Sequence, residues 1–273
     1  MKQKPPTLIG VIHLPPLPGS PGSFGDEPGE VLRRAGLQAV KEAKILSKAG
    51  FDGIILENFG DTPFFKNAVP PETIASMSVI AAAVRETSTL PLGINVLRND
   101  ARAAIAIGAV TGCQFIRVNV LSGVYATDQG LIEGEAAELV RERAKLCTNI
   151  AILADVHVKH ARSLSDSGKD IALCIEETFD RAGADAVIIS GFATSKPVSA
   201  EDLESASRIS RAKHIPLYVG SGVQADTLAD VLKLADGIIV SSALRKAGRA
   251  GAPLDSIRIK NFVKAFRSFR KKR

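Results

Sequence analysis

Tryptophan is absent from the sequence, and aromatic residues of all kinds make up only 5% of its 273 residues, with two tyrosines among them. Proteins that recognise single-stranded nucleic acids stack the bases on aromatic side chains. A chain this poor in aromatics has few residues from which to build such a platform. We therefore expect no nucleic-acid partner.

Cysteine is also scarce. Cys113, Cys147 and Cys174 are far apart in the chain, odd in number and part of no C-x-x-C motif. This pattern argues against a disulfide framework and against a zinc site built from thiolates. Because free cysteine is among the most buried residue types, we expect three buried thiols.

Long hydrophobic runs are missing as well. The apolar runs at residues 186–190 and 237–240 fall far short of the ~20 residues that a membrane-spanning helix needs. Residues 1–6, with the sequence MKQKPP, lack the apolar region of a signal peptide. These absences predict a soluble, cytoplasmic protein.

The net charge is +6, because 35 Lys and Arg residues outnumber 29 Asp and Glu residues, and part of the excess lies at residues 267–273. Such an excess is compatible with an anionic ligand or an anionic surface. An apolar stripe at helical spacing runs through the last segment and favours a helix packed on the body of the protein. A membrane-surface helix is the alternative, so peripheral membrane contact stays open but is not favoured. The stripe consists of Ile259, Phe262, Val263, Phe266 and Phe269.

Short apolar runs alternate with amphipathic segments along the whole chain. The runs are rich in Ile, Val and Leu and nearly continuous, which is typical of parallel strands covered on both faces. Eight strand–helix units of about 34 residues predict a single (β/α)8 TIM barrel over residues 1–273. A doubly wound sheet is the alternative, but no G-x-G-x-x-G follows the first strand. The expected strands are residues 7–14, 53–57, 92–96, 115–119, 150–156, 186–190, 217–219 and 237–240.

The expected helices lie between these strands. Pro28 and Pro71 are suited to the first turn of a helix, and Gly50 is suited to a left-handed C-terminal cap. No low-complexity tract or linker interrupts the series, which supports one domain. Helices in barrels commonly mediate association, so a homo-oligomer stays open. The expected helices are residues 28–49, 71–87, 101–110, 133–147, 169–182, 200–212, 225–234 and 255–269.

Polar side chains gather where the expected strands end, the edge at which barrel enzymes place their chemistry. One strand alternates so that Arg117 and Asn119 share a face with Phe115, which points Arg117 into the barrel. A buried charge needs a partner, and Glu57 or Asp155 could supply it. We expect substrate contacts from His13, Asn58, Asn95, Arg117, Asn119 and Asp128.

The segment ADVHVKH at residues 154–160 is the densest group of reactive side chains. If the strand extends through it, Asp155, His157 and Lys159 lie on one face. Asp155 could then orient His157 for acid–base catalysis, Lys159 could form a Schiff base, and Glu57 could assist. Asp155 and His157 could also hold a divalent metal together with Glu57 or His13, and the spacing does not choose among these roles. No other cofactor is required.

Two glycine- and serine-rich turns follow the last two strands. Glycines let backbone N–H groups face an anion, and barrels often bind phosphate at these two loops. This predicts a phosphate-binding site and a small phosphorylated ligand. Its residues are Gly220, Ser221, Gly222, Ser241 and Ser242. Two long loops, residues 14–29 with five prolines and residues 120–132, are expected to be lids or partner surfaces.

Several of these segments resemble motifs of the BtpA/SgcQ family, over nearly the whole chain. The segments are IGVIHLPPLPGSP (9–21), DGIILEN (52–58), GINVLRND (93–100), FIRVN (115–119), DQG (128–130), ADVHVKH (154–160) and GSGV (220–223). The resemblance implies a TIM barrel of the ribulose-phosphate-binding kind. In cyanobacteria the family is linked to the accumulation of photosystem I, and no catalytic mechanism comes with it.

Two functions follow as hypotheses. The first is an enzyme, an isomerase, lyase or hydrolase, that acts on a small phosphorylated metabolite. The second is a non-catalytic assembly or stability factor that binds a protein or membrane partner through the proline-rich loop or the basic end. A scaffold has no need for so many polar groups facing one cavity, so we favour the enzyme.

Overall fold

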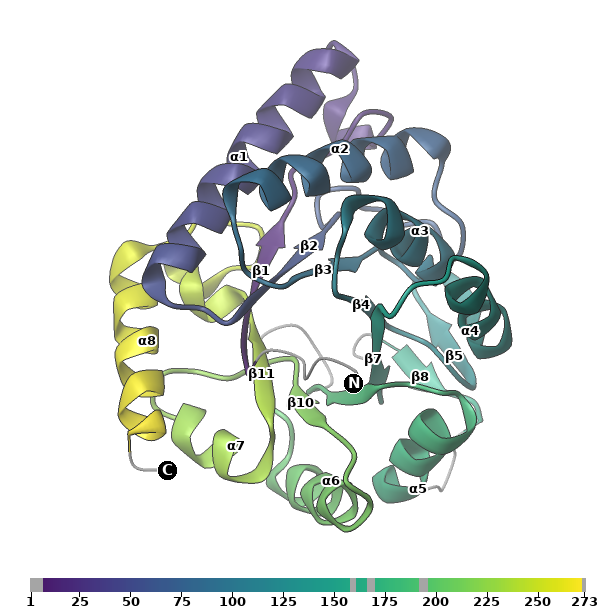
Figure 1. The fold of residues 1–273 in the computed structure, drawn as a ribbon, viewed down its shortest axis with the longest axis vertical. Coiled ribbons are helices and arrows are strands. Elements are labelled where there is room, and N and C mark those ends of the chain that lie inside the picture. Colours follow the sequence, from purple (N-terminus) through teal and green to yellow (C-terminus); the bar gives the residue numbers. More distant parts are fainter. Residues whose placement is uncertain (1–6, 158–160, 166–169, 192–195, 272–273) are drawn as a thin grey trace.

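A computed structural model describes residues 7–157, 161–165, 170–191 and 196–271. Eight parallel strands close into a barrel, with helices packed around its outside (Figure 1). The TIM-barrel prediction is therefore confirmed. In spatial order the strands are β1 (Leu8–His13), β11 (Gly237–Val240), β10 (Leu217–Val219), β9 (Ala186–Ile189), β7 (Ala151–Val156), β4 (Phe115–Val118), β3 (Leu92–Asn95) and β2 (Gly53–Glu57).

The main helices follow the strands in the predicted order. In chain order they are α1 (Pro28–Ala49), α2 (Pro71–Thr87), α3 (Ala101–Thr111), α4 (Ala136–Lys145), α5 (Ile171–Glu176), α6 (Ala200–Lys213), α7 (Leu228–Leu234) and α8 (Ser256–Arg270). α1 has Pro28 in its first turn, a Glu27 carboxylate that accepts from the Glu30 N–H at 2.8 Å, and Gly50 at φ 94° after its end. Pro28 and Gly50 are the start and stop signals that the sequence predicts, and the Glu27 cap is an addition that the structure shows. α8 buries Ile259, Phe262, Val263 and Phe266.

Alternate strand residues fill the barrel interior. Ile9, Val11, Ile55, Leu153 and Ile188 belong to this inner cluster, together with the rings of Phe115 and Tyr218. A side chain at Gly93 would collide with the Phe115 ring, so the glycine provides the space that the ring occupies. At the next inward-facing position along the strands, the barrel lining changes from apolar to polar, and this position lies at the C-terminal end of the barrel.

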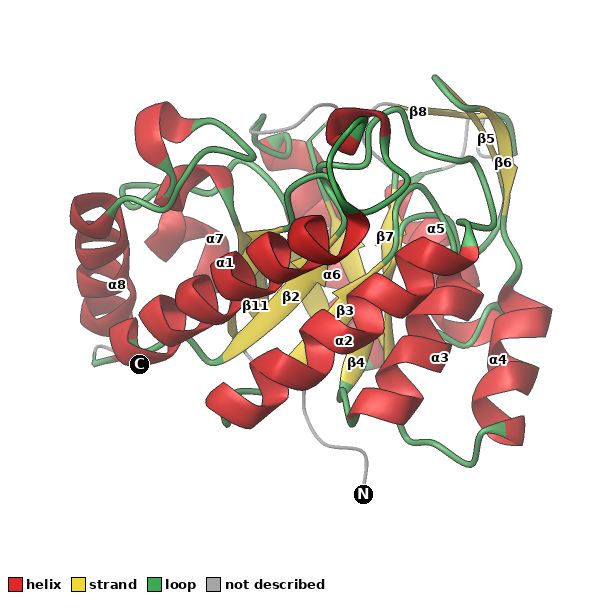
Figure 2. Ribbon diagram, turned by 90° about the horizontal axis from the view of Figure 1, so that it is seen from above, coloured by secondary structure: helices red, strands yellow, loops and turns green. Residues whose placement is uncertain are grey.

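The segment expected as a long loop at residues 120–132 contains a small sheet instead. β5 (Val124–Thr127) pairs antiparallel with β6 (Gly130–Glu133) and with β8 (Ala161–Ser163). Tyr125 and Ile132 face each other and are buried with Val120, which gives the hairpin a core of its own. The next helix therefore begins at Ala136 rather than at residue 133. Figure 2 shows the sheet at the end of the barrel where the strands terminate.

Two further expectations differ in detail. The helix expected at 169–182 is described as α5 followed by one wide turn, Glu177–Arg181, in which the Ala182 N–H donates to the Glu177 carbonyl. Cys113 and Cys174 are buried as expected, but Cys147 is exposed, because α4 ends at Lys145 and the chain turns outward with φ 50° at Cys147. In the described part of the chain, no helix is long and apolar enough to cross a membrane.

The proline-rich loop at residues 14–29 is a shaped segment with one short helix, Pro21–Ser23. The Ser23 hydroxyl donates to the Leu17 carbonyl at 2.8 Å, and the Leu17 N–H donates to the Asp61 carboxylate at 2.8 Å. Burial raises the pKa of Asp61, and it outweighs the hydrogen bonds that this carboxylate accepts from the Leu17 N–H and the Asn58 amide. The loop is thus tied to the loop that follows β2.

Candidate functional site

A cavity of about 300 Å³ lies at the C-terminal ends of the barrel strands. Among the described residues, six of the barrel strands or the loops after them contribute to its wall, so it is the place where these polar strand ends converge. Most of the expected site residues lie on this wall: His13, Glu57, Asn95, Arg117, Asn119, Asp128, Gly220, Ser221, Gly222, Ser241 and Ser242.

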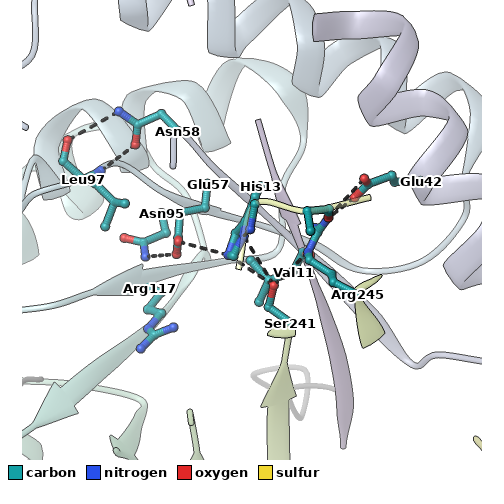
Figure 3. Close-up of polar contacts among 12 residues, drawn as sticks. Val11, His13, Glu42, Glu57, Asn58, Asn95, Leu97, Arg117, Ser241 and Arg245 are labelled. Atoms are coloured by element: carbon teal, nitrogen blue, oxygen red, sulfur yellow. Dashed lines mark hydrogen bonds and ion pairs between the residues drawn. The ribbon is translucent and has the colours of Figure 1, made fainter. Parts of the chain in front are cut away.

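His13 and Glu57 form one half of the polar floor (Figure 3). Glu57 accepts a hydrogen bond from the Asn95 amide at 2.7 Å, and its other oxygen lies 3.5 Å from His13 Nε2. The Gly251 N–H donates to His13 Nδ1 at 2.9 Å. Because a backbone N–H can only donate, Nδ1 must accept, and the neutral ring carries its proton on Nε2. That N–H therefore faces the Glu57 carboxylate.

The ring of His13 is held from two more sides. It stacks on Phe59 with 4.2 Å between the ring centroids, and Ser241 Oγ lies 3.2 Å from Nε2. Gly251 also packs near Phe59, at a position with φ 77° where a side chain would be strained. The imidazole thus has a single defined position at the cavity wall.

Arg117 forms the other half of the floor, and Asp155, which is not among the described residues that line the cavity, lies behind it. Arg117 points into the barrel, as predicted, and donates two hydrogen bonds to Asp155, at 3.0 and 2.9 Å. Burial by itself lowers the pKa of Arg117, but the charge and hydrogen bonds of Asp155, with a contribution from Glu57, raise it overall. The guanidinium is therefore a permanent buried cation.

Asn119 completes this pair. Its amide donates to the same Asp155 carboxylate at 2.8 Å. Its Oδ1 is buried and has no hydrogen-bond partner among the described residues. An unpaired acceptor on a cavity wall suits a hydroxyl group of a ligand.

A second buried ion pair lies behind the cavity wall. Arg245 is fully buried and donates to both oxygens of Glu42 on α1, at 3.2 and 3.0 Å. It also donates to the carbonyls of Val11 and Ala252 and to Ser241 Oγ. Figure 3 shows this chain of contacts from α1 to Ser241 and on to His13. Arg245 is thus a structural residue that positions the site.

The two glycine- and serine-rich turns lie side by side on one wall of the cavity, after β10 and β11. Gly220 contacts its surroundings so closely that a Cβ would meet Ile188 at 2.7 Å and Ser190 Oγ at 2.9 Å. Gly222 has φ 74° and packs against the backbone of Pro197. Both glycines are therefore required by the turn itself, and their presence alone does not identify a phosphate site.

Three expectations about site residues differ from the structure or lie outside it. β7 ends at Val156, and His157 has φ 54°, which breaks the alternation that would have placed it beside Asp155. The Asp155 carboxylate instead accepts hydrogen bonds from Arg117 and Asn119, so it does not orient His157 as expected. Lys159 lies outside the described residues.

Asn58 also has a different role. Its side chain accepts from the Leu97 N–H at 2.7 Å and donates to Asp61 Oδ2 at 3.1 Å. Within the described part of the chain it is not on the cavity wall. Asn58 therefore joins the loops after β2 and β3 rather than facing a substrate.

Sequence reasoning missed Arg98, Phe59 and Phe64, which all line the cavity. Arg98 stands in the GINVLRND segment, three residues beyond the inward-facing Asn95, and that position was the available signal. The two phenylalanines follow β2 in a loop whose path no periodicity reveals.

Among the described residues, no group of three or more His, Cys, Asp and Glu side chains is placed to hold a metal ion. The carboxylates of Asp155 and Glu57 accept hydrogen bonds from Arg117, Asn119 and Asn95. The metal role considered for Asp155 and His157 with Glu57 or His13 stays a prediction.

Comparison with known proteins gives a family match. The model of the BtpA family matches residues 3–268. Photosystem I biogenesis protein BtpA of Synechocystis is 45% identical over 94% of this chain and 87% of its own length. An uncharacterized protein of Methanocaldococcus jannaschii is 46% identical over 96% of this chain and 95% of its own length. A protein of Caenorhabditis elegans, described as uncharacterized and mitochondrial, is 33% identical over 95% of this chain and 92% of its own.

Solved structures with the same fold are more distant in sequence. N-(5'-phosphoribosyl)anthranilate isomerase from Pyrococcus furiosus superposes with a TM-score of 0.58 at 14% identity, covering 96% of this chain and 99% of the other. Thiamine phosphate pyrophosphorylase from the same organism gives 0.56 at 18% identity, covering 96% of each chain. At such identities the likeness concerns the fold alone.

Proposed function

The chain belongs to the BtpA family, and we propose that it is an enzyme that binds a small phosphorylated metabolite in the barrel cavity and acts on it by acid–base chemistry. One observation carries the proposal. The cavity brings an imidazole–carboxylate pair, His13 and Glu57, together with the two loops where barrels of this kind bind phosphate.

The phosphate end of the ligand would lie against the turns after β10 and β11. Ser221 and Ser242 offer hydroxyl groups there, and the glycines allow close approach of the backbone. The solved barrels with the same fold include proteins whose names contain a phosphoribosyl or a phosphate compound. These names support the ligand class without specifying the reaction.

The reacting end of the ligand would lie over the floor of the cavity. The Glu57 carboxylate can accept a proton, while the His13 Nε2–H can donate one, because its other nitrogen is held by the Gly251 amide. Arg117, locked by Asp155, supplies a positive charge that would stabilise negative charge developing on a substrate oxygen. Isomerase and lyase chemistry needs only such groups.

A second candidate is a non-catalytic role in the assembly of a protein complex. It is supported by the name of the Synechocystis relative, a photosystem I biogenesis protein. The relatives in Methanocaldococcus and Caenorhabditis extend the family well beyond that organism. A buried, charged cavity is a costly feature for a scaffold, so the enzyme is the function that the geometry favours.

The proposal is tested by a thermal-shift screen of the purified protein against sugar phosphates, nucleotides and other phosphorylated metabolites, with and without a divalent metal. A ligand at about 100 times its Kd adds roughly 2.7 kcal/mol of stability. For a chain of this size that raises Tm by several degrees. We expect at least one phosphorylated compound to produce such a shift.

Two matched variants separate specific binding from a general effect. Ser242→Asp places a carboxylate beside the expected phosphate and should abolish the shift, whereas Ser242→Asn has nearly the same shape without the charge and should retain it. With a ligand in hand, turnover is followed by ³¹P NMR, and Glu57→Gln should stop turnover while binding persists. A screen without any hit would favour the assembly role, whereas an unchanged shift in Ser242→Asp would show that the phosphate does not lie beside Ser242.

A further inference from the structure

Asn119 presents a buried hydrogen-bond acceptor at the cavity that the proposed chemistry does not use. It follows β4 by one residue and lies on the cavity wall, and only 3% of its surface is exposed. Its amide nitrogen donates to Asp155 Oδ2 at 2.8 Å, while its Oδ1 has no hydrogen-bond partner among the described residues. A buried acceptor without a partner is rare in a folded protein, and a donor supplied by a ligand would remove the cost of leaving it unpaired.

The orientation of this amide is fixed by its neighbours. Arg117 donates to both oxygens of Asp155, so the carboxylate is charged and can only accept hydrogen bonds. Turning the Asn119 amide over would place its oxygen against Asp155 Oδ2, and two acceptors would then face each other at 2.8 Å. The nitrogen must therefore face Asp155, and the oxygen must lie on the other side of the amide group.

A second amide, on the neighbouring strand, is held in the same way. Asn95, the last residue of β3, donates its amide nitrogen to Glu57 Oε2 at 2.7 Å. Figure 3 shows that its amide oxygen is directed away from Glu57. The register of β3 and β4 puts Asn95 level with Arg117, one inward position before Asn119. Two adjacent strands thus each present an amide whose nitrogen is held by a carboxylate.

These amide oxygens stand beside hydrogen-bond donors. The Arg117 guanidinium shares Asp155 Oδ2 with the Asn119 amide, so the two groups are neighbours. The Nε2–H of His13 lies on the same floor. A hydroxyl group donates one hydrogen bond and accepts two, so it fits a wall that mixes acceptors with donors. An ionised carboxylate or phosphate oxygen has no hydrogen to give to an amide oxygen.

We propose that Asn119, with Asn95 beside it, binds hydroxyl groups of the ligand, so that the phosphorylated metabolite is a sugar phosphate. The phosphate lies at the β10 and β11 turns, and the hydroxyl groups lie along the ends of β3 and β4. A cavity of about 300 Å³ is at the small end of ligand pockets, which suits sugar phosphates of roughly three to six carbons. This inference rests on the proposed function, because it needs a phosphorylated ligand in this cavity.

The test measures whether the loss of a single hydroxyl group weakens binding. The probes are the phosphates of glycerol, erythrose, ribose, ribulose and glucose. Isothermal titration calorimetry compares each one with analogues in which one hydroxyl group is replaced by hydrogen. For at least one hydroxyl position, the deoxy analogue should bind the unchanged protein about tenfold more weakly or worse, because it leaves the amide oxygen without a donor.

Asn119→Ala assigns this loss to one side chain. In the variant, the sugar phosphate should bind about tenfold more weakly, whereas the deoxy analogue should keep its affinity within about twofold. If Asn119 only supported the Asp155–Arg117 pair, both ligands would lose affinity equally. Asn119→Ser keeps a hydroxyl group that can accept from a ligand and should retain part of the discrimination.

Asn99→Ala is the matched control. Asn99 is also buried, but its amide exchanges two hydrogen bonds with the backbone of Val120, at 2.8 and 2.9 Å. Because Val120 directly follows Asn119, this variant disturbs the same stretch of backbone without removing the acceptor. It should lower the Tm and leave the discrimination between hydroxyl and deoxy ligands unchanged. If Asn119→Ala does not fold, Asn119→Ser and the deoxy series on the unchanged protein still decide the question.

The outcomes separate the two proposals. Equal affinity for every sugar phosphate and its deoxy analogues would overturn the hydroxyl assignment and leave phosphate binding intact. Equal loss of both ligands in Asn119→Ala would make Asn119 a support of Asp155 instead. Binding only of phosphorylated compounds that carry no hydroxyl group would overturn the sugar class. Failure of every phosphorylated ligand to bind would overturn the proposed function as well.

Discussion

Individual side chains in this protein owe their chemical state to their immediate surroundings. His13 is fixed in one tautomer by a backbone amide, and Arg117 is kept charged chiefly by Asp155. The cysteines show the same dependence in a form that is simple to measure. Burial raises the pKa of Cys113 to about 11 and outweighs the opposing effects of the Thr111 hydroxyl and Arg85, whereas Cys147 is exposed.

At the residue scale we therefore expect one reactive thiol. Ellman's reagent at about pH 8 should modify Cys147 quickly and Cys113 and Cys174 only after unfolding, because the thiolate is the reacting form. Cys147→Ser should remove the fast phase. The pKa of Cys113 is higher in the folded protein than in the unfolded chain. Its contribution to the free energy of unfolding is therefore fully present below about pH 9 and declines as the pH rises toward 11. A second fast thiol in the native protein at pH 8 would contradict the burial of Cys113 and Cys174.

The packing of the barrel strands depends on the alternation of inward and outward side chains and on the glycines that leave room for it. The inward positions run from apolar residues to the polar floor, for example from Phe115 to Arg117. Gly93 is needed because the Phe115 ring occupies the place of its side chain. Gly36, in the middle of α1, has no comparable neighbour, since a Cβ there would approach only Ile80, at 4.0 Å.

This difference predicts that replacing glycine by alanine changes the free energy of unfolding in opposite directions at Gly93 and Gly36. Gly93→Ala should lower the free energy of unfolding by about 1–3 kcal/mol, because it overpacks the barrel interior. Gly36→Ala should raise it by about 0.5–1 kcal/mol, because alanine is the better helix former. Urea titration measures both. Adding Phe115→Leu to Gly93→Ala should recover part of the loss, and a stabilising Gly93→Ala would refute the packing of the ring against Gly93.

Across the whole molecule, the Arg245–Glu42 pair connects segments that are more than 200 residues apart. It joins α1 near the start of the chain to the loop after β11, and that loop supplies the Gly251 amide to His13. The closing of the barrel between β1 and β11 brings these segments together. The site is thus completed only when the two ends of the chain have met.

At the whole-molecule scale we expect Glu42→Ala to cost about 3–5 kcal/mol of stability, because it leaves a buried guanidinium without its counterion. The double variant Glu42→Leu/Arg245→Met removes both charges and should recover most of this loss. In both variants the ring of His13 should lose its single tautomer, which the ¹⁵N chemical shifts of the imidazole report. A loss below about 1 kcal/mol in Glu42→Ala, with unchanged His13 shifts, would show that the pair has no such role.

Local sequence patterns are sufficient to predict the barrel and most of the cavity wall. Strand order, helix boundaries such as Pro28–Ala49 and the inward direction of Arg117 follow from local patterns, namely hydrophobic period, caps and alternation. The C-terminal ends of the strands in a parallel barrel all lie at one rim. The sequence alone therefore predicts that His13, Glu57 and Asn95 lie close together.

Which of these groups form hydrogen bonds or ion pairs with one another depends on the tertiary structure. It paired Asp155 with Arg117 rather than with His157, withdrew Asn58 into a loop contact, added Arg98 to the wall and joined Gly251 to His13. The physical reason is that each such contact joins residues distant in the chain. Its geometry depends on where a strand ends, as at Val156, and on the path of the loop beyond it, and neither leaves a periodic signal in the sequence.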